Sequence, residues 1–215
     1  MFDDSQARLN NLGEPASLPA GHAGLTPDFQ GLSAHFIELV SERIVPYKSG
    51  EAIFNGEEVS ANNANPYGFT RAIDHDQAIV AASGEAFTEI LIKDIKPGTY
   101  KHARISVAFQ RYGITFNVNN IPVVGDLKNQ KGTVASFVGY NTHINDLLVH
   151  EKVLAVNQAK LQGFWAFETQ FDGAFAVYNQ LSSGQGISHA NGFFTKDRNE
   201  IISDTATQSC LDQPT

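Results

Sequence analysis

The chain has 215 residues, of which 42% are hydrophobic and 18% are charged, and its formal net charge is −8 at pH 7. A compact chain of this length buries roughly 70% of the surface that it exposes when unfolded, so it needs no disulfide to hold a core. The 15 lysines and arginines form no basic cluster, which argues against nucleic acids and anionic lipids as partners. The single cysteine, Cys210, excludes an internal disulfide and a cysteine-based zinc site.

Residues 1–30 are polar and interrupted by glycine and proline, and we expect an extended N-terminal arm there. Residues 31–215 are expected to form one domain, because β-like patterning continues across the loop at 120–132. No stretch of about 18 apolar residues is present, so we predict no transmembrane segment. The first residues lack the basic and apolar regions of a leader, and we expect an exported protein whose leader has been removed.

Short runs with a period of two follow the arm, and this period is typical of half-buried strands. The run at 33–40 leads to Asn55-Gly56, a pair that favours a tight hairpin turn. The runs at 77–83 and 87–95, together with the strand after the Pro97-Gly98 turn, are expected to form an up-and-down meander. In that last strand one parity is apolar and the other polar: Ala103, Ile105, Val107 and Phe109 against His102, Arg104 and Ser106.

Further strand-like runs lie at 114–118, 133–140, 150–156, 161–169 and 173–179, which makes about ten in the whole chain. No segment keeps a helical period over three turns, and the best helix candidates are the short segments 141–154 and 155–162. The predicted fold is therefore all-β, a mostly antiparallel β-sandwich with an extended N-terminal arm.

Two carboxylates and two imidazoles would meet at one end of this meander. Asp74, His75 and Asp76 precede its first strand, and His102 follows the turn that lies at the same end. Such a mixture of nitrogen and oxygen ligands suits Zn²⁺ or Cu²⁺, whereas two carboxylates are too few for Ca²⁺. Alternation along an extended segment would send His75 away from both aspartates, so the alternative is a solvated loop without metal.

The remaining histidines have simpler interpretations. His143 and His150 are expected near the opposite end of the sheet, as surface side chains or as a second paired site. His35 shares its parity with Ile37 and Leu39, which predicts a hydrogen-bonded histidine in or at the edge of the core.

The segment Gly163–Glu168 has aromatic residues on both parities, because Phe164 alternates with Trp165 and Phe167. Such a strand is either covered on both faces or carries an exposed platform, and an exposed Trp165 would suit a flat sugar or a partner surface. A polysaccharide hydrolase with Trp165 as its sugar platform would also need two acidic residues about 5–9 Å apart. No nucleophile motif is present, and a non-catalytic protein is the better reading.

The segments "DIKPGTYKHARISVAFQRYGITF", "GTVASFVGYNTHIND" and "LQGFWAFET" resemble those of uncharacterised surface lipoproteins of flavobacteria and their relatives. That resemblance covers residues 90–180 and implies a lipid anchor, although the lipid-bearing cysteine expected at the mature start is not in this sequence. The "PGTY" turn and the Phe-Trp strand are also similar to MbnP-like copper-binding β-sandwiches. In that family a tryptophan and histidines attend the metal, which implies roles for Trp165 with His75 or His102.

Two functions follow as hypotheses. The first is an exported, surface-anchored, non-catalytic binding protein that holds a metal ion or small ligand on the loops at one end of the sandwich. Its location would be extracellular or at the cell surface. The second is a structural subunit that assembles with itself or a surface partner by adding a strand, supplied by the N-terminal arm, to an open sheet edge.

Overall fold

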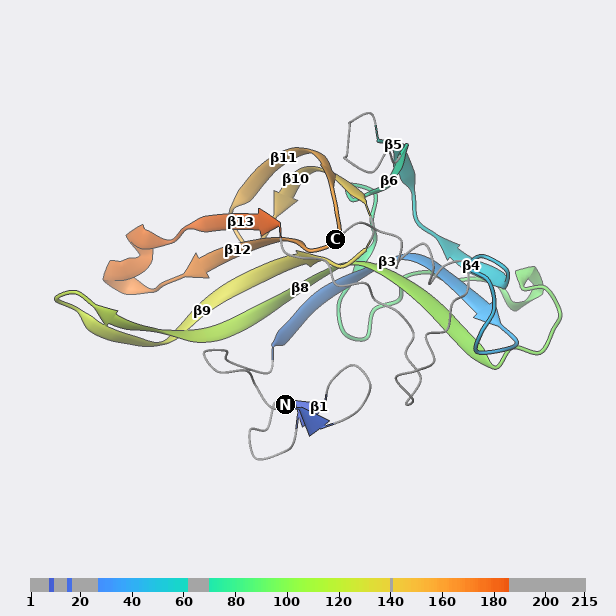
Figure 1. The fold of residues 1–215 in the computed structure, drawn as a ribbon, viewed down its shortest axis with the longest axis horizontal. Coiled ribbons are helices and arrows are strands. Elements are labelled where there is room, and N and C mark those ends of the chain that lie inside the picture. The colour runs from blue at the N-terminus through green and yellow to red at the C-terminus, as the bar shows by residue number, and fades with distance from the viewer. Residues whose placement is uncertain (1–7, 10–14, 17–26, 62–69, 140, 186–215) are drawn as a thin grey trace.

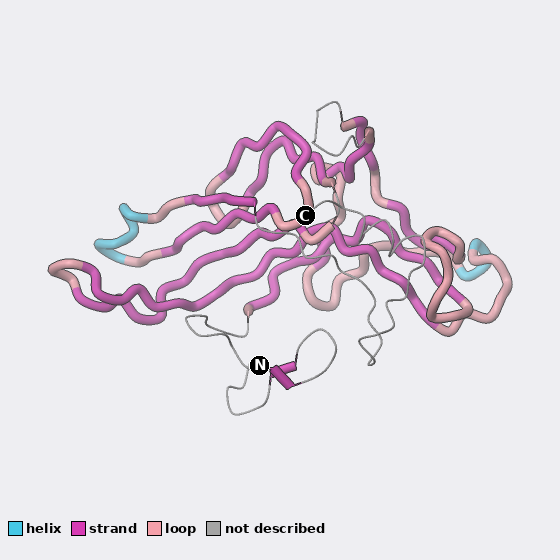
Figure 2. The backbone as a smooth tube through the Cα atoms, viewed as in Figure 1, coloured by secondary structure: helices cyan, strands magenta, loops and turns pink. Residues whose placement is uncertain are grey.

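The computed structural model describes residues 8–9, 15–16, 27–61, 70–139 and 141–185 of the chain. They form an all-β fold in which two sheets face each other, and this confirms the predicted fold class (Figures 1 and 2). The arm was predicted to reach residue 30, but the first long strand already begins at Asp28. Within the rest of the arm the structure describes one two-stranded pair, β1 (Arg8–Leu9) with β2 (Pro15–Ala16).

Within the described residues the larger sheet has seven strands, and every neighbouring pair in it is antiparallel. Its two longest strands, β8 and β9, form a hairpin that projects beyond the rest of the sheet at one end (Figure 1). The order across the sheet is β13 (Leu181–Gln185), β12 (Phe164–Gln170), β9 (Gly125–Phe137), β8 (His102–Ile121), β3 (Asp28–Val40) and β4 (Glu51–Asn55), and the short β7 (Val80–Ala81) also pairs with β3.

The smaller sheet has four strands in the described part of the chain and lies over one face of the larger one (Figure 1). Its central pair is parallel, so that Asp74 lies beside His143 in the register. Its order is β11 (Val153–Lys160), β10 (Thr142–Leu148), β6 (Arg71–Asp74) and β5 (Glu58–Ser60). Two short 3₁₀ helices complete the described elements, η1 (Ile92–Asp94) and η2 (Gly173–Tyr178).

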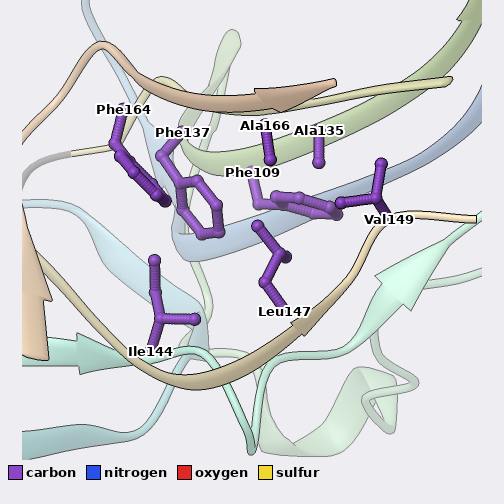
Figure 3. Packing of buried hydrophobic residues seen from close by; sticks show 8 residues of the cluster. All are labelled: Phe109, Ala135, Phe137, Ile144, Leu147, Val149, Phe164 and Ala166. Carbon is purple, nitrogen blue, oxygen red and sulfur yellow. The ribbon is translucent and has the colours of Figure 1, made fainter. Parts of the chain in front are cut away.

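The main core lies between the two sheets (Figure 3). Ile144 and Leu147 of β10 pack against side chains of the larger sheet, and each such fully buried side chain contributes about 1.5–3 kcal/mol. Large and small side chains alternate on the facing strands, which lets the two layers approach closely. The cluster consists of Phe109, Ala135, Phe137, Ile144, Leu147, Val149, Phe164 and Ala166.

Several local predictions are wrong. Residues 173–179, expected to form a strand, contain the 3₁₀ helix η2. Asn55-Gly56 does not close a hairpin, because β4 pairs with β3 and β5 pairs with β6. The segment 77–95 forms only the two-residue β7, a loop and η1, because β8 already has β3 and β9 as neighbours and leaves no place for a meander. The helix candidates 141–154 and 155–162 instead form the hairpin of β10 and β11. Packing of Ile144 and Leu147 against the larger sheet decides this outcome over weak local helical preference.

The strand after the Pro97-Gly98 turn alternates less regularly than its sequence suggests. Register shifts against β3 at Ser33/Ala34 and Ala34/Phe36 change which side chains face inward. Ile105 is consequently exposed, while Arg104 reaches the fully buried carboxylate of Glu38. The polar face of this strand therefore contributes to a structural ion pair and is not only a solvent-exposed surface.

Among the described residues no helix is both long and apolar enough to cross a membrane.

Candidate functional site

The outer face of the larger sheet, which points away from the smaller sheet, has a row of apolar side chains. Strand alternation puts Trp165 and Phe167 on this face, because Phe164 and Ala166 beside them are buried in the core. Phe167 is in register with Val134 of β9, which in turn is in register with Tyr112 of β8. Three neighbouring strands thus present one apolar row, which we call the outer aromatic face, with Trp165 beside it.

Two glycines allow the rings of this face to pack directly on the backbone of a neighbouring strand. A Cβ atom added to Gly184, the register partner of Trp165, would lie only 2.9 Å from the indole ring. A Cβ atom added to Gly132 would likewise lie within 2.7 Å of the Phe167 ring. Both rings therefore rest against the bare backbone of a neighbouring strand, which holds them down on the sheet.

Further aromatic rings extend the outer aromatic face toward the projecting hairpin. The ring of Phe116 packs edge-on against that of Phe167 with centroids 5.7 Å apart, and against that of Phe171 at 6.1 Å. Such edge-to-face pairs are favourable beyond the area that they bury. Burial raises the pKa of the Tyr112 hydroxyl, so this side chain stays a neutral hydrogen-bond donor at physiological pH.

Trp165 keeps 37% of its surface exposed, and polar side chains lie next to it in the register. Ser136 and Gln110 continue its row across β9 and β8, and Ser182 lies opposite Phe167 on β13. An apolar ring surface with hydroxyl and amide groups at its border matches a ligand that has an apolar face and polar edges. The single tryptophan predicted as a ligand platform is accordingly one member of a larger surface.

The residues predicted as metal ligands are distributed over separate places. His102 lies exposed at the first position of β8, in register with Val40. The ring of His75 packs against Phe109, which lies seven residues further along β8, or about 23 Å at the usual rise of a strand. In the described part of the chain no group of three or more His, Cys, Asp and Glu is placed to hold a metal ion. Copper or zinc binding stays a prediction from the sequence.

His75 and its two neighbouring aspartates point in different directions, as alternation requires. The imidazole packs edge-on against the rings of both Phe109 and Phe137, with both centroids 4.9 Å away. Burial lowers the pKa of His75, although the charges of Asp76 and Asp74 oppose this effect. His75 is therefore mainly a neutral packing residue between the sheets, and Asp74 and Asp76 belong to a different cluster.

That cluster includes His143, which the meander had placed at the opposite end of the sheet. This placement is wrong, because His143 is the register partner of Asp74 and its carbonyl accepts a hydrogen bond of 3.0 Å from the His75 amide. His150 lies apart, in the turn between β10 and β11, with its ring 3.9 Å from Glu151. His35 fits its prediction, since its Nε2 atom is 3.0 Å from the Glu58 carboxylate and burial lowers its pKa.

Glu168 is the acidic residue that lies closest to Trp165 along β12, and it points into the space between the sheets. Its carboxylate accepts hydrogen bonds from the backbone amides of His150, Glu151 and Lys152, at 2.9–3.3 Å. It therefore holds the β10–β11 turn against the larger sheet. Glu168 is therefore not placed to act as one of the two carboxylates that sugar hydrolysis beside Trp165 would need.

No family model matches the chain, and neither a curated protein nor a solved structure shows significant similarity to it. The resemblances to surface lipoproteins and to copper-binding sandwiches stay predictions from the sequence.

Sequence reasoning found Trp165 but missed its companions. The shared parity of Tyr112 with Phe116 and of Trp165 with Phe167 was a usable signal, because it marked two strands with aromatic faces. The missing information was the register that joins Tyr112 to Val134 and Val134 to Phe167, because it brings Tyr112 and Phe167, 55 residues apart along the chain, onto one row.

Proposed function

We propose that this protein is a non-catalytic binding protein that holds polysaccharide on the outer aromatic face of its larger sheet. The observation that carries the proposal is the seating of Trp165 on Gly184 and of Phe167 on Gly132, with Trp165 partly exposed. A pyranose ring has one apolar face formed by C–H groups and an edge of hydroxyls. Indole and phenyl faces attract the first, and hydroxyl or amide side chains bond to the second.

The arrangement of the face also supports an extended ligand over a compact one. Tyr112 and Phe167 lie on strands two positions apart, which corresponds to about 10 Å at the usual spacing between strands. Phe116 continues the apolar surface along the strand direction. A polymer of several sugar units could therefore contact more than one ring, and weak contacts to each ring would add up.

An extracellular or cell-surface location, with or without a lipid anchor, is part of this proposal, because polysaccharides are abundant there. The alternative ligand site at the loop end, with a metal ion on Asp74, His75, Asp76 and His102, has less support. His102 lies far along β8 from the place where His75 packs.

The single tryptophan makes the proposal directly testable, because all indole fluorescence comes from Trp165. We expect soluble polysaccharides, tested as a panel of neutral and acidic glucans, xylans and galactans, to change this emission in a saturable way. Trp165→Ala should abolish retention of the protein in gels that contain the same polysaccharide. Trp165→Phe, which keeps an aromatic ring, should restore part of that retention.

Ile92→Ala is the matched control, because Ile92 is an exposed apolar residue of η1, which lies outside the larger sheet. Its retention should equal that of the unmodified protein. Retention of Trp165→Ala at the unmodified level would contradict the proposal. So would an emission change that depends on protein concentration alone and is accompanied by a rising mass in light scattering, since a second copy would then cover the face.

A further inference from the structure

A small cavity opens on the outer side of the four-stranded sheet, remote from the outer aromatic face. Its volume is about 260 Å³, and it lies between β5, β6, β10 and β11. Val59, Ala61 and Ala159 form its apolar wall, while Asp74, His143 and Asn145 form its polar wall. Such a combination of one apolar side and a few convergent polar groups is typical of small-molecule sites.

The backbone brings the two titratable residues of the cavity together. β6 and β10 run parallel, with Asp74 and His143 as direct register partners, so their side chains leave the sheet next to each other. The β10–β11 register shifts between Ile144 and Asp146, which leaves Asn145 outside the regular pairing. Asn145 can therefore turn its amide toward both His143 and the turn after β6.

A chain of hydrogen bonds fixes the orientation of the imidazole. The Nδ2 atom of Asn145 donates to the carboxylate of Asp76, and its Oδ1 atom is 3.2 Å from Nε2 of His143. Because an amide oxygen can only accept, Nε2 of His143 must carry the proton in this bond. In the neutral ring the Nδ1 atom is then a hydrogen-bond acceptor.

Asp74 supplies a second acceptor with a formal negative charge. Its Oδ1 atom accepts from the amide of Asp76 at 3.0 Å, and its other oxygen has no hydrogen bond within the described residues. Neither Asp74 nor Asp76 forms an ion pair with a lysine or arginine of the described chain. The cavity is therefore lined by the Asp74 carboxylate and the His143 imidazole, and the Asp76 carboxylate lies behind Asn145, an arrangement that favours a cation.

We propose that this cavity binds a small primary alkylammonium ion. Ammonium carries three N–H donors, of which two match the free oxygen of Asp74 and Nδ1 of His143. The alkyl part would lie against Val59, Ala61 and Ala159. A transition metal suits the cavity less well, because a closed site takes four ligands, and among the described residues that line the cavity only Asp74 and His143 are strong ones.

The test is titration of ¹⁵N-labelled protein with n-butylammonium chloride, followed by NMR of the Asn145 side-chain amide and the His143 ring. Both signals should shift in a saturable way, whereas n-butanol at equal concentration should leave them unchanged. Asp74→Asn should weaken binding about tenfold or more, because a charge-assisted hydrogen bond is lost. This variant should fold, since an asparagine oxygen can still accept from the Asp76 amide.

Asp146→Asn is the matched control, because it removes the same charge from an exposed neighbour on β10 that does not line the cavity. It should leave the affinity unchanged. Equal weakening by both variants would overturn the proposal in favour of a general charge effect. Saturable shifts with Zn²⁺ but none with the amine would overturn it in favour of a metal. Emission of Trp165 should not respond to the amine, so this test is independent of polysaccharide binding.

Discussion

Arg104 and Glu38 form an ion pair of 2.9 Å in which the glutamate side chain has 0% exposure. The same carboxylate accepts the backbone amides of Gly50 at 2.8 Å and Lys48 at 3.3 Å. The guanidinium of Arg104 in turn donates to the carbonyl oxygens of Val45 and Pro46, at 2.6 and 3.1 Å. The pair therefore fastens the loop 41–50 onto the end of the larger sheet and satisfies its backbone groups.

Removal of Arg104 should be strongly destabilising. Arg104→Ala leaves the Glu38 carboxylate buried without its cation, and we expect the free energy of unfolding to fall by about 3–5 kcal/mol. Urea denaturation followed by circular dichroism measures this loss. Lys101→Ala, which breaks the exposed 3.2 Å pair with Glu42, serves as the control and should cost less than about 1 kcal/mol.

The double variant Glu38→Leu/Arg104→Met separates the contribution of the ion pair to stability from that of the hydrogen bonds between Glu38 and the loop 41–50. Many buried ion pairs can be replaced by apolar residues with little loss. Here the amides of Lys48 and Gly50 would lose their acceptor, so the double variant should stay well below the unmodified protein in stability. Recovery to the unmodified level would show that the loop finds other partners.

Glu168 should behave in a similar way at the other layer of the fold. Glu168→Ala removes the acceptor of three backbone amides in the turn 150–152, and we expect a loss of about 2–4 kcal/mol. Glu168→Gln keeps one acceptor oxygen and should lose less. Amide hydrogen exchange supplies the readout: the amides of the turn 150–152 should exchange faster in Glu168→Ala. Unchanged exchange there would refute the role given to this carboxylate.

Both carboxylates illustrate which part of the fold is readable from the sequence. Period-two runs were sufficient to predict an all-β fold, because burial of one strand face is a local pattern. The same pattern put Glu38 and Arg104 on strand positions without revealing that they meet, since they lie 66 residues apart. The cavity of Asp74 and His143 was missed for the same reason. It depends on the parallel pairing of β6 with β10, which no local signal encodes.

The exposed apolar segment Ile90–Ile92 is a case in which a local pattern predicted a strand that does not form. Its composition is that of a strand, yet all three side chains are exposed and the segment leads into η1. Strand preference is realised only where a partner strand is available, and β3 and β9 already occupy both edges of β8.

The lowered pKa of His75 predicts how stability changes with pH. Because burial against Phe109 and Phe137 holds this pKa below its ordinary value of 6.5, the unfolded chain binds the proton more tightly than the folded one. Stability is therefore full above pH 6.5 and falls as the pH drops toward the folded pKa. His35 adds to this loss in the same range, since burial also lowers its pKa.

His75→Phe should make the profile flatter, because the ring keeps its edge-on contacts and loses its titration. Urea denaturation at a series of pH values between 7.5 and 5.5 measures the slope, and Glu58 contributes little there because its pKa lies below 4.5. His102→Gln is the control, since His102 is exposed at the start of β8. A slope for His75→Phe as steep as that of the unmodified protein would exclude His75 as its source.

The tip of the β8–β9 hairpin should become more stable when Val123 is replaced by glycine. The amide of Val124 donates to the Ile121 carbonyl at 3.2 Å, with Pro122 and Val123 as the two central residues of the turn. Val123 has a φ of 70°, as the third position of a type II turn requires, and this conformation costs a β-branched residue about 1–3 kcal/mol.

The side chain of Val123 is fully exposed, so its removal forfeits no packing. Glycine accepts the positive φ but loses more freedom on folding, which offsets about 0.4–1 kcal/mol of the gain. We therefore expect Val123→Gly to raise the free energy of unfolding by roughly 1 kcal/mol in urea denaturation. Val124→Gly is the control, because Val124 has no positive φ to relieve, and it should be neutral or destabilising. Destabilisation by Val123→Gly equal to that of Val124→Gly would mean that the turn is not strained at Val123.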